Sequence, residues 1–388
     1  MDQDMTDRAI KPFTVNVSDA EIDDLKSRIR NTRWLDDFEN ESWKYGMPQS
    51  YLRELADYWV TEYDWRKHEA EINSYDHFRV VIDDVPIHFI WVKAKKPSSG
   101  ALILTHGWPW TFWDYKGVIP LLSDPEEGPA YDLVIPSLPG FGYSSPLCKT
   151  GLNPTTTADL WAKLMTMLGY DKFGAVGGDW GAFVTANLNH AHADRLYGAY
   201  LSLSAIPGLD FSKLTAEDYD GPGEEGWYER WTARMATAYA HSMVNSAAPQ
   251  TIGYALNDSP LGLASWIVER RRLWSDWEHD FEEVLSKDVL LTGVSIYWYT
   301  QTVGTAARFY EEAHLHPFKP RHDSKTLPAP TAFGIFPRDL LLLPRKLAEQ
   351  HANVARWTVM PKGGHFAPSE QPELLAADVR AFFAEQMG

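Results

Sequence analysis

The spacing of hydrophobic residues divides this chain into a leading helical stretch and a longer stretch in which strands and helices alternate. Over residues 13–73 the apolar positions recur every three or four residues, which is typical of amphipathic helices. In SDAEIDDLKSRIRNTRW, Ser18 and Glu21 have the spacing of a capping box at a helix N-terminus. QSYLRELADYWVTEY, which begins at Gln49, predicts a second helix. The chain is therefore expected to open with a helical segment.

From residue 77 onward, short apolar runs predict strands. HFRVVIDDVPIHFIWV alternates with a period of two on either side of Asp83 and Asp84, which predicts a hairpin. The later runs are more continuously apolar: ALILTHG from residue 101, YDLVIPSL from 131, FGAVGG from 173, GAYLSLS from 198, TAFGIF from 331 and ARWTVM from 355. Helical patterns such as TTTADLWAKLMTMLGY separate most of them. This alternation predicts an α/β fold with a mostly parallel central sheet and helices on both faces.

One long interval interrupts the alternation. Residues 207–324 are helical in pattern and rich in tryptophan and tyrosine, and strands resume only after them. A helical insertion between two strands of such a sheet is the arrangement of a core with a lid. We therefore expect an N-terminal segment of helices plus the hairpin over residues 1–95, a core over residues 96–206 and 325–388, and a helical lid over residues 207–324.

Composition narrows the class of function. Lysine plus arginine number 36 and aspartate plus glutamate number 53, so the net charge of −17 argues against binding to nucleic acid. Cys148 is the single cysteine, which excludes an intrachain disulfide and fits a cytoplasmic location. The leading MDQDMTDRAIKPF lacks the apolar core of a secretion signal, and no apolar run is long enough to span a membrane. We expect a soluble protein without a membrane partner, and a homodimer as the default assembly.

Residues with catalytic potential follow the predicted core strands directly. HGWPW, PGFGYS and GGDWG each follow a strand before the lid, whereas FPRD, ending at Asp339, and GGHF, containing His365, follow the two strands after it. In open α/β sheets functional groups gather at the carboxyl ends of the strands. Asp179 of GGDWG, then Asp339, then His365 have the chain order of a nucleophile, an acid and a histidine in hydrolases, with aspartate in the place of serine.

The same residues also admit a structural interpretation. An aspartate in GxDxG can cap the following helix, because aspartate favours N-cap positions. Asp339 follows a proline in a loop, where aspartates are common, and His365 in isolation would be a surface or structural histidine. The strand before Asp179, the small-residue helix after it and the histidine downstream favour the catalytic interpretation.

Two tryptophan N–H groups are candidates for an oxyanion hole. Such a hole takes one backbone N–H from the residue after the nucleophile, here Trp180, and one from the loop after an earlier strand, here Trp108. Pro109 would fix that loop, although the sequence does not determine whether the Trp108–Pro109 peptide bond is cis. His106 is interpreted as a structural hydrogen-bonding residue of the same turn.

Together, these motifs resemble those of the epoxide hydrolases of the α/β-hydrolase superfamily, specifically the microsomal-type group with an N-terminal epoxide hydrolase domain. The resemblance covers almost the whole chain: the helical N-terminal segment, HGWPW, PGFGYS, GGDWG, the lid phrases LNDSPLGLASWI and RFY, and then FPRD and GGHFAP. HGxP and GGDWG alone are shared with haloalkane dehalogenases, whereas their combination with the N-terminal segment and the lid phrases is specific.

The resemblance implies a mechanism through a covalent intermediate. Asp179 would attack an epoxide carbon to form an alkyl-enzyme ester, and His365, oriented by Asp339, would activate the water that hydrolyses it. Two lid tyrosines protonate the ring oxygen in the family, and the matching positions here are Tyr239 in TAYAHSM and Tyr310 in RFYEE. No metal and no organic cofactor is implied.

The expected substrate is a small hydrophobic epoxide, which water converts to a vicinal diol. The tryptophan-rich lid favours an apolar cavity for a bulky aryl epoxide, and Trp110 and Phe141 are candidate pocket residues. The microsomal-type group includes detoxification enzymes and enzymes of bacterial natural-product pathways, enediyne routes among them, so the resemblance implies one of these settings.

Two other functions fit part of the pattern. A haloalkane dehalogenase uses the same Asp–His–acid machinery, but it needs halide-stabilising donors in place of the lid tyrosines, and the RFY and YAH phrases favour the epoxide. A non-catalytic binding protein of the same fold would be expected to lack one of the catalytic groups, and all of them are present.

Overall fold

The computed structural model describes residues 9–388 and every side chain in that range except that of Ala236. Residues 1–8, which make up most of the stretch used to judge a secretion signal, lie outside the described residues. Between residues 9 and 388, no helix is both long enough and apolar enough to cross a membrane.

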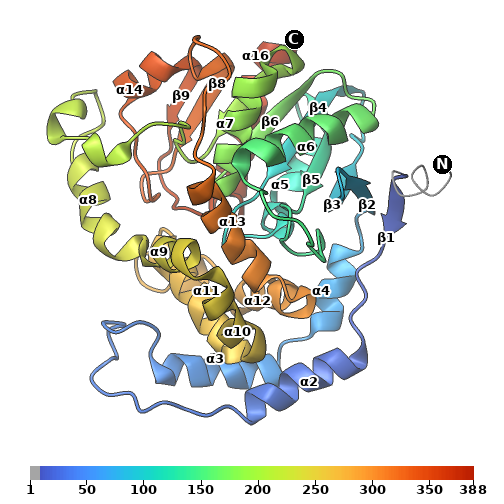
Figure 1. The fold of residues 1–388 in the computed structure, drawn as a ribbon, viewed down its shortest axis with the longest axis vertical. Helices are drawn as coiled ribbons and strands as arrows, with labels where there is room; N and C mark the ends of the chain where they lie inside the picture. Colours follow the sequence, from blue (N-terminus) through green and yellow to red (C-terminus); the bar gives the residue numbers. More distant parts are fainter. Residues whose placement is uncertain (1–8) are drawn as a thin grey trace.

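A nine-stranded sheet runs through the described chain in the order β1-β2-β3-β5-β4-β6-β7-β8-β9 (Figure 1). The strands are β1 (Lys11–Phe13), β2 (His77–Ile82), β3 (Val85–Val92), β4 (Ser98–Thr105), β5 (Ala130–Pro136), β6 (Phe173–Gly177), β7 (Leu196–Leu201), β8 (Leu327–Ile335) and β9 (Ala352–Val359). Strands β4 to β9 pair with one another in parallel. Strands β1, β2 and β3 continue the sheet beyond β5, and their pairs are antiparallel. The predicted α/β fold with a mostly parallel sheet is confirmed.

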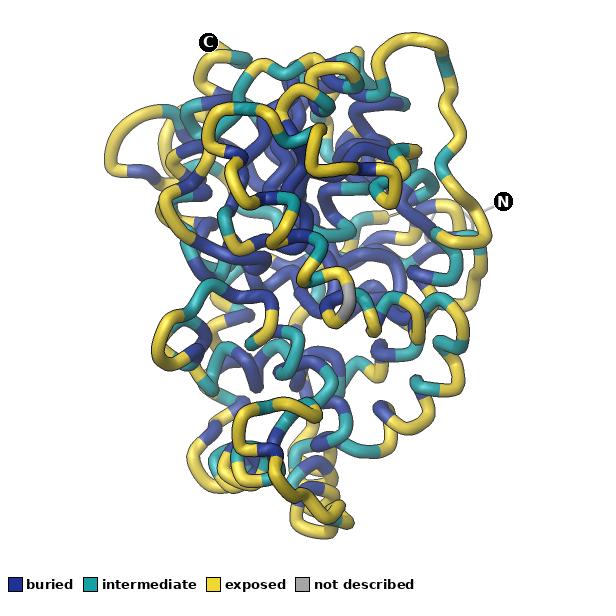
Figure 2. Tube along the Cα trace, turned by 90° about the vertical axis from the view of Figure 1, so that its left-hand side faces the viewer, coloured by how far each residue is buried: buried dark blue, intermediate teal, exposed yellow. Residues whose placement is uncertain are grey.

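Helices cover both faces of this sheet. The core helices are α5 (Val118–Ser123), α6 (Pro154–Met167), α7 (Trp180–His192), α14 (Arg345–His351), α15 (Ala367–Glu370) and α16 (Pro372–Met387). On β6, Gly174 faces Phe383 of α16 and Gly177 faces Gly181 of α7, which places these helices on opposite faces. β5 and β6 are accordingly buried along their whole length. Figure 2 shows the buried segments gathered in the interior and the exposed ones on the outer loops.

The N-terminal segment contributes to two parts of the molecule. Its helices are α2 (Asp19–Arg30), α3 (Gln49–Thr61) and α4 (Trp65–Ile72). The predicted capping box is present, because the Glu21 N–H donates to Ser18 Oγ and the Ser18 N–H donates to the Glu21 carboxylate. The predicted hairpin is also present, with Asp83 and Asp84 between β2 and β3, and it joins the edge of the central sheet. α2 and α3 instead pack against the lid (Figure 1).

The interval between β7 and β8 is helical, as its pattern predicted. Its helices are α8 (Trp227–Ala238), α9 (Ala240–Ala247), α10 (Pro249–Asp258), α11 (Pro260–Trp274), α12 (Lys287–Thr300) and α13 (Val303–Leu315). Most of them, α9 to α13, lie between the sheet and the helices α2 and α3, whereas α8 lies beside the sheet (Figure 1). The three-part division at residues 95, 206 and 324 stays a prediction, and the hairpin of the first part belongs to the same sheet as the core.

Candidate active site

Asp179 lies at a sharp turn between β6 and α7. Its backbone has φ 50° and ψ −127°, a conformation that residues with a side chain rarely adopt. Its side chain makes no capping hydrogen bond to α7. The carboxylate instead contacts the loop after β4 and the ring of His365. The interpretation of Asp179 as a helix cap is therefore wrong for this chain.

Two glycines make room for this turn. A Cβ at Gly181 would lie 1.9 Å from the backbone oxygen of Thr105, so α7 approaches β4 more closely than a side chain would permit. A Cβ at Gly107 would lie 2.1 Å from Oδ1 of Asp179. The carboxylate therefore reaches the loop after β4 only because residue 107 has no side chain.

The two oxygens of the Asp179 carboxylate have different partners. The Trp108 N–H donates to Oδ1 over 2.7 Å, and Oδ2 lies 3.2 Å from Nε2 of His365. Burial by itself would raise the pKa of this carboxyl. The hydrogen bond and charge of His365, together with the N–H groups of Trp108 and Trp180, outweigh burial and lower the pKa. Asp179 is thus a partly buried carboxylate that is ionised at neutral pH.

His365 connects the two predicted acids. It lies between β9 and α15, is 1% exposed, and its Nδ1 lies 2.7 Å from Oδ1 of Asp339 in the loop after β8. Burial would lower the pKa of the imidazole, but the charges and hydrogen bonds of Asp339 and Asp179 raise it to about 9. Burial raises the pKa of Asp339 against the opposing effect of His365. Asp339, His365 and Asp179 therefore form one continuous chain of contacts.

Tyr310 of α13 approaches this chain of contacts from the lid. Its ring lies edge-on to Trp180, with centroids 4.8 Å apart and 84° between the planes, and edge-on to Trp108 at 5.9 Å. Its hydroxyl is buried and has no hydrogen-bond partner among the described residues, which is rare for a buried donor. Burial, and then the charge of Asp179, raise the pKa of this hydroxyl well above 10, so it stays protonated.

Tyr239 lies between α8 and α9 and is half-buried. Burial raises the pKa of its hydroxyl, and the charges of Asp339 and Asp179 raise it further. The charge of Asp179 thus raises the pKa of both tyrosines that the lid motifs indicated, Tyr239 and Tyr310.

The two candidate pocket residues are fully buried. Trp110 packs edge-on against the ring of His365 at 5.5 Å. Phe141 packs edge-on against His106 at 5.6 Å and against Phe309 at 5.8 Å. Contact with the substrate stays a prediction for both.

The turn that contains His106 is held by hydrogen bonds. Its Nδ1 donates to the Gly107 carbonyl and its Nε2 accepts from the Leu138 N–H. Burial lowers the pKa of His106 to about 4, so the ring is neutral and acts structurally, as interpreted. The Trp108–Pro109 peptide bond, which the sequence left open, is cis.

Sequence reasoning missed His241 of α9. Its ring stacks on Trp108 at 5.0 Å with 7° between the planes, and it lies edge-on to Tyr310 at 5.5 Å. Its Nδ1 donates to the Ala238 carbonyl, and burial lowers its pKa to about 4. The phrase TAYAHSM contains this histidine, but nothing in the phrase indicates that α9 turns it toward Trp108.

A cavity of about 310 Å³ borders the site between α7, α9 and α13, and both Trp180 and Tyr310 line it. Phe183 and Phe318 add apolar surface to it. No group of three or more histidine, cysteine or carboxylate side chains in the described part of the chain is arranged to hold a metal ion.

Two family models match the chain. Residues 10–115 match the model of the epoxide hydrolase N terminus, and residues 100–280 match that of the alpha/beta hydrolase fold. The first covers the N-terminal helices, the hairpin and the HGWPW loop, and the second covers the turn at Asp179 and much of the lid.

Relatives match over nearly the full length. The chain is 37% identical over 382 residues to a protein of Stigmatella aurantiaca named "Putative epoxide hydrolase", a match that covers 97% of this chain and 85% of that protein. It is 34% identical over 408 residues to epoxide hydrolase 1 of Oryctolagus cuniculus, covering 97% of this chain and 89% of that one.

Solved structures agree with these relatives. The juvenile hormone epoxide hydrolase from the silkworm Bombyx mori superposes with a TM-score of 0.87 at 26% identity, covering 98% of this chain and 95% of that one. The epoxide hydrolase of Aspergillus niger superposes with a TM-score of 0.84 at 29% identity, covering 98% of this chain and 97% of that one. The resemblance seen in the motifs is confirmed, and the chain belongs to the epoxide hydrolases, a family of enzymes with the α/β-hydrolase fold.

Proposed function

We propose that this epoxide hydrolase opens a hydrophobic epoxide through an ester on Asp179 and that water activated by His365 hydrolyses the ester to release a vicinal diol. The observation that carries this proposal is that the two oxygens of the Asp179 carboxylate have different partners. Oδ1 accepts a hydrogen bond from the Trp108 N–H, and Oδ2 faces Nε2 of His365. A carboxylate held in this way has one oxygen at the backbone N–H donors and the other oxygen, at His365, in place to attack the substrate.

In the first step, Oδ2 attacks a ring carbon of the epoxide. A bond forms between Oδ2 and that carbon while the bond from the carbon to the ring oxygen breaks, which leaves a hydroxyalkyl ester on Asp179. The ring oxygen needs a proton, because an alkoxide is a poor leaving group. Tyr310 and Tyr239 supply it, since both hydroxyls stay protonated at neutral pH and that of Tyr310 has no partner in the described chain.

Ester formation itself prepares His365 for the second step. In the resting enzyme the charge and hydrogen bond of Asp179 help to raise the pKa of His365 to about 9. Esterification removes that negative charge, so the pKa of His365 falls. The imidazolium then passes its proton to the tyrosinate that ring opening leaves, and the neutral imidazole can accept a proton from water. Water then attacks Cγ of Asp179 and gives its proton to Nε2, while Asp339 stabilises the imidazolium.

The tetrahedral intermediate carries its negative charge on Oδ1. The Trp108 N–H already donates to this oxygen, and the Trp180 N–H also reaches the carboxylate. The intermediate collapses by breaking the bond from Cγ to the oxygen that carries the alkyl group, and that oxygen takes the proton of the hydroxyl that water added to Cγ, which leaves the diol and the Asp179 carboxylate. The first diol therefore takes one oxygen from Asp179, and the oxygen of water replaces it.

The surroundings of Tyr310 favour an aryl-bearing substrate. Trp108, Trp180 and His241 present aromatic rings to this tyrosine, and Phe183 and Phe318 add aromatic surface to the partly polar lining of the cavity beside it. On these grounds the proposed substrate is a bulky aryl epoxide, whereas a natural-product route of the enediyne type stays a prediction from the family resemblance. The cytoplasmic location and the homodimer remain predictions from the sequence.

Replacing His365 by glutamine is expected to trap the ester, because glutamine cannot accept the proton of the attacking water. Turnover should fall by about 100-fold or more. After mixing with excess epoxide and quenching in acid, mass spectrometry should show the peptide that contains Asp179 heavier by one substrate molecule. Asp179→Asn is the control and should carry no adduct. Intact turnover of the His365→Gln enzyme without an adduct would contradict the mechanism.

The double variant Tyr239→Phe/Tyr310→Phe should slow ester formation by about 100-fold, because no acid protonates the ring oxygen. Hydrolysis of an ester already formed should be unchanged within roughly 3-fold, because the base and the N–H donors remain. Rapid-quench measurements separate the two rates. Tyr299→Phe removes a buried lid hydroxyl whose ring packs on Trp65, and it should leave both rates unchanged. A double variant that opens epoxides at the wild-type rate would rule out the tyrosines as acids.

Stability is expected to depend on pH through His365. Its pKa is raised from 6.5 to about 9 in the folded protein, so its stabilising contribution is complete below pH 6.5 and is lost as the pH rises through about 9. The free energy of unfolding of the wild type should fall by on the order of 3 kcal/mol relative to that of His365→Gln across this range. Urea titrations at several pH values measure the difference. Identical pH dependence in the two proteins would show that the imidazole is not held as a cation by the carboxylates.

A substrate panel tests the class of epoxide. Aryl epoxides should have kcat/KM values at least about 10-fold above those of short aliphatic epoxides, because a ring buries more apolar surface. In ¹⁸O-labelled water the diol from a single turnover should be unlabelled, and haloalkanes should release no halide. Equal kcat/KM values for short aliphatic epoxides would contradict the aryl proposal. Halide release without diol formation would contradict epoxide hydrolysis.

A further inference from the structure

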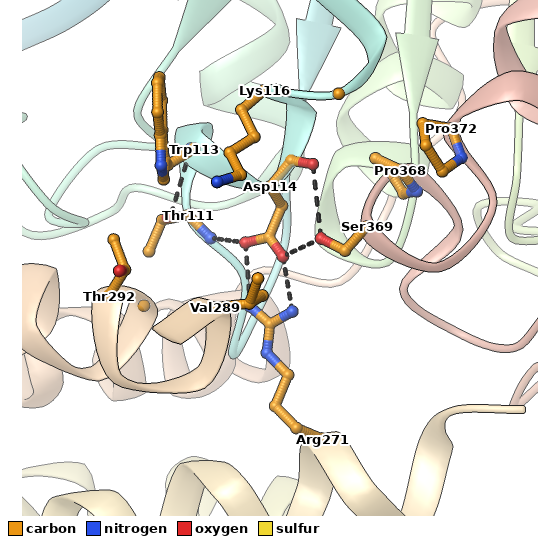
Figure 3. Close-up of a pocket in the computed structure, with 12 residues that line it drawn as sticks. Thr111, Trp113, Asp114, Lys116, Arg271, Val289, Thr292, Pro368, Ser369 and Pro372 are labelled. Carbon is orange, nitrogen blue, oxygen red and sulfur yellow. Dashed lines mark hydrogen bonds and ion pairs between the residues drawn. The ribbon is translucent and has the colours of Figure 1, made fainter. Parts of the chain in front are cut away.

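The lid helix α11 is joined to the loop after β4 by a buried ion pair (Figure 3). Arg271 donates from Nη1 to Oδ1 of Asp114 over 2.5 Å and from Nη2 to Oδ2 over 2.9 Å. Asp114 lies in the short 3₁₀ helix η1 (Phe112–Tyr115) and also accepts from the Thr111 N–H and the Ser369 hydroxyl, both over 2.7 Å. Arg271 and Asp114 are 3% and 8% exposed, so solvent does not screen the pair.

Arg271 also contacts the loop next to the nucleophile. Its Nη2 donates to the Pro109 carbonyl over 3.1 Å. Pro109 directly follows Trp108, whose N–H donates to Oδ1 of Asp179. A continuous path of hydrogen bonds and covalent bonds thus leads from α11 through Arg271 and Pro109 to the oxygen that carries negative charge during ester hydrolysis.

Both hydrogen bonds and packing hold this loop, because Trp108 and Trp110 on either side of Pro109 are buried. A cavity of about 240 Å³ borders the ion pair, and Thr111, Trp113, Val289 and Ser369 line it together with Asp114 and Arg271 (Figure 3). Burial would raise the pKa of Asp114, but the charge and hydrogen bonds of Arg271 outweigh burial and lower it. The planar guanidinium has donors for both the carboxylate and the carbonyl, which a lysine ammonium on a flexible stem does not match.

The end of the same helix also contacts the loop that carries the base. The His365 N–H donates to the Trp274 carbonyl over 2.9 Å, and the Trp274 ring lies edge-on to the His365 ring at 5.3 Å. The rings of Trp266 and Trp274, also on α11, pack on Trp108 as well, at 6.4 and 6.2 Å. Arg271 adds a directed hydrogen bond to the residue that follows Trp108.

We propose that Arg271 is a positioning residue, which holds the loop at Pro109 so that the Trp108 N–H stabilises the oxyanion on Asp179 while the ester is hydrolysed. The inference rests on the proposed function. During ester formation negative charge leaves the carboxylate, so this N–H is needed less as the step proceeds. During hydrolysis negative charge develops on Oδ1, so a displaced N–H raises that barrier.

Arg271→Met tests the proposal, because methionine fills much of the same space without donors. Its rate of ester hydrolysis should fall by at least about 10-fold, a part of the roughly 100- to 1,000-fold effect of losing one oxyanion-hole donor. Its rate of ester formation should stay within about 3-fold of the wild-type value. Ester should therefore accumulate at steady state, and kcat and KM should fall together. Rapid-quench mass spectrometry of the Asp179 peptide gives the rates of ester formation and ester hydrolysis. The ratio of these two rates does not depend on the fraction of the enzyme that is folded.

Arg356→Met is the matched control, because Arg356 pairs with a buried carboxylate, Asp378, between β9 and α16. It should lower the unfolding midpoint and leave the ratio of the two rates unchanged.

An unchanged ratio in Arg271→Met, or equal slowing of both steps, would overturn the proposal. Should Arg271→Met not fold, Arg271→Lys decides by the same criterion. If His365→Gln traps no ester, the proposed function itself fails, whereas a trapped ester with an unchanged ratio in Arg271→Met refutes only the role of Arg271.

Discussion

A carboxylate that is largely removed from water stays ionised only where other groups compensate its charge, and Asp179 obtains those groups from three separate parts of the chain. The loop after β4 supplies the Trp108 N–H, the start of α7 supplies the Trp180 N–H, and the loop after β9 supplies His365. These parts meet because parallel strands end at one edge of the sheet. The charge of Asp179 in turn raises the pKa of His365, so consuming that charge in an ester would release the histidine to act as a base.

The lid also contributes side chains to the surroundings of Asp179. Tyr310 brings a buried hydroxyl, which has no hydrogen-bond partner in the described part of the chain, next to Trp180, and His241 stacks on Trp108, whose N–H donates to the Asp179 carboxylate. Arg271 reaches the same loop from α11. α2 and α3 pack on the outer side of the lid, so the N-terminal segment supports the lid while its hairpin extends the sheet. In this chain the accessory segment thus packs on a lid that itself contacts the loop beside the proposed nucleophile.

Local patterns predicted much of this correctly. The capping box at Ser18 and Glu21, the hairpin at Asp83 and Asp84, and the alternation of strands and helices depend on residues close together in the chain. Asp179, Asp339 and His365 could be selected because each follows a predicted strand, and the structure places them in contact. Arg271 and Asp114 gave no such signal, because they are 157 positions apart and neither belongs to a motif that indicates the other. The sequence did not indicate the role of His241, because the direction of its side chain depends on how α9 packs.

The sequence by itself determined the fold class, the family and the chain order of the candidate catalytic groups, because periodicity, motif spacing and strand ends are properties of short segments. Only the tertiary structure decided that Asp179 does not cap α7, that its two oxygens have different partners, and that α11 is joined to the loop beside it. Those features depend on distances between segments that are remote in the chain. The parallel strands of the sheet set the distances around Asp179, and the packing of the lid against the sheet sets those around Arg271.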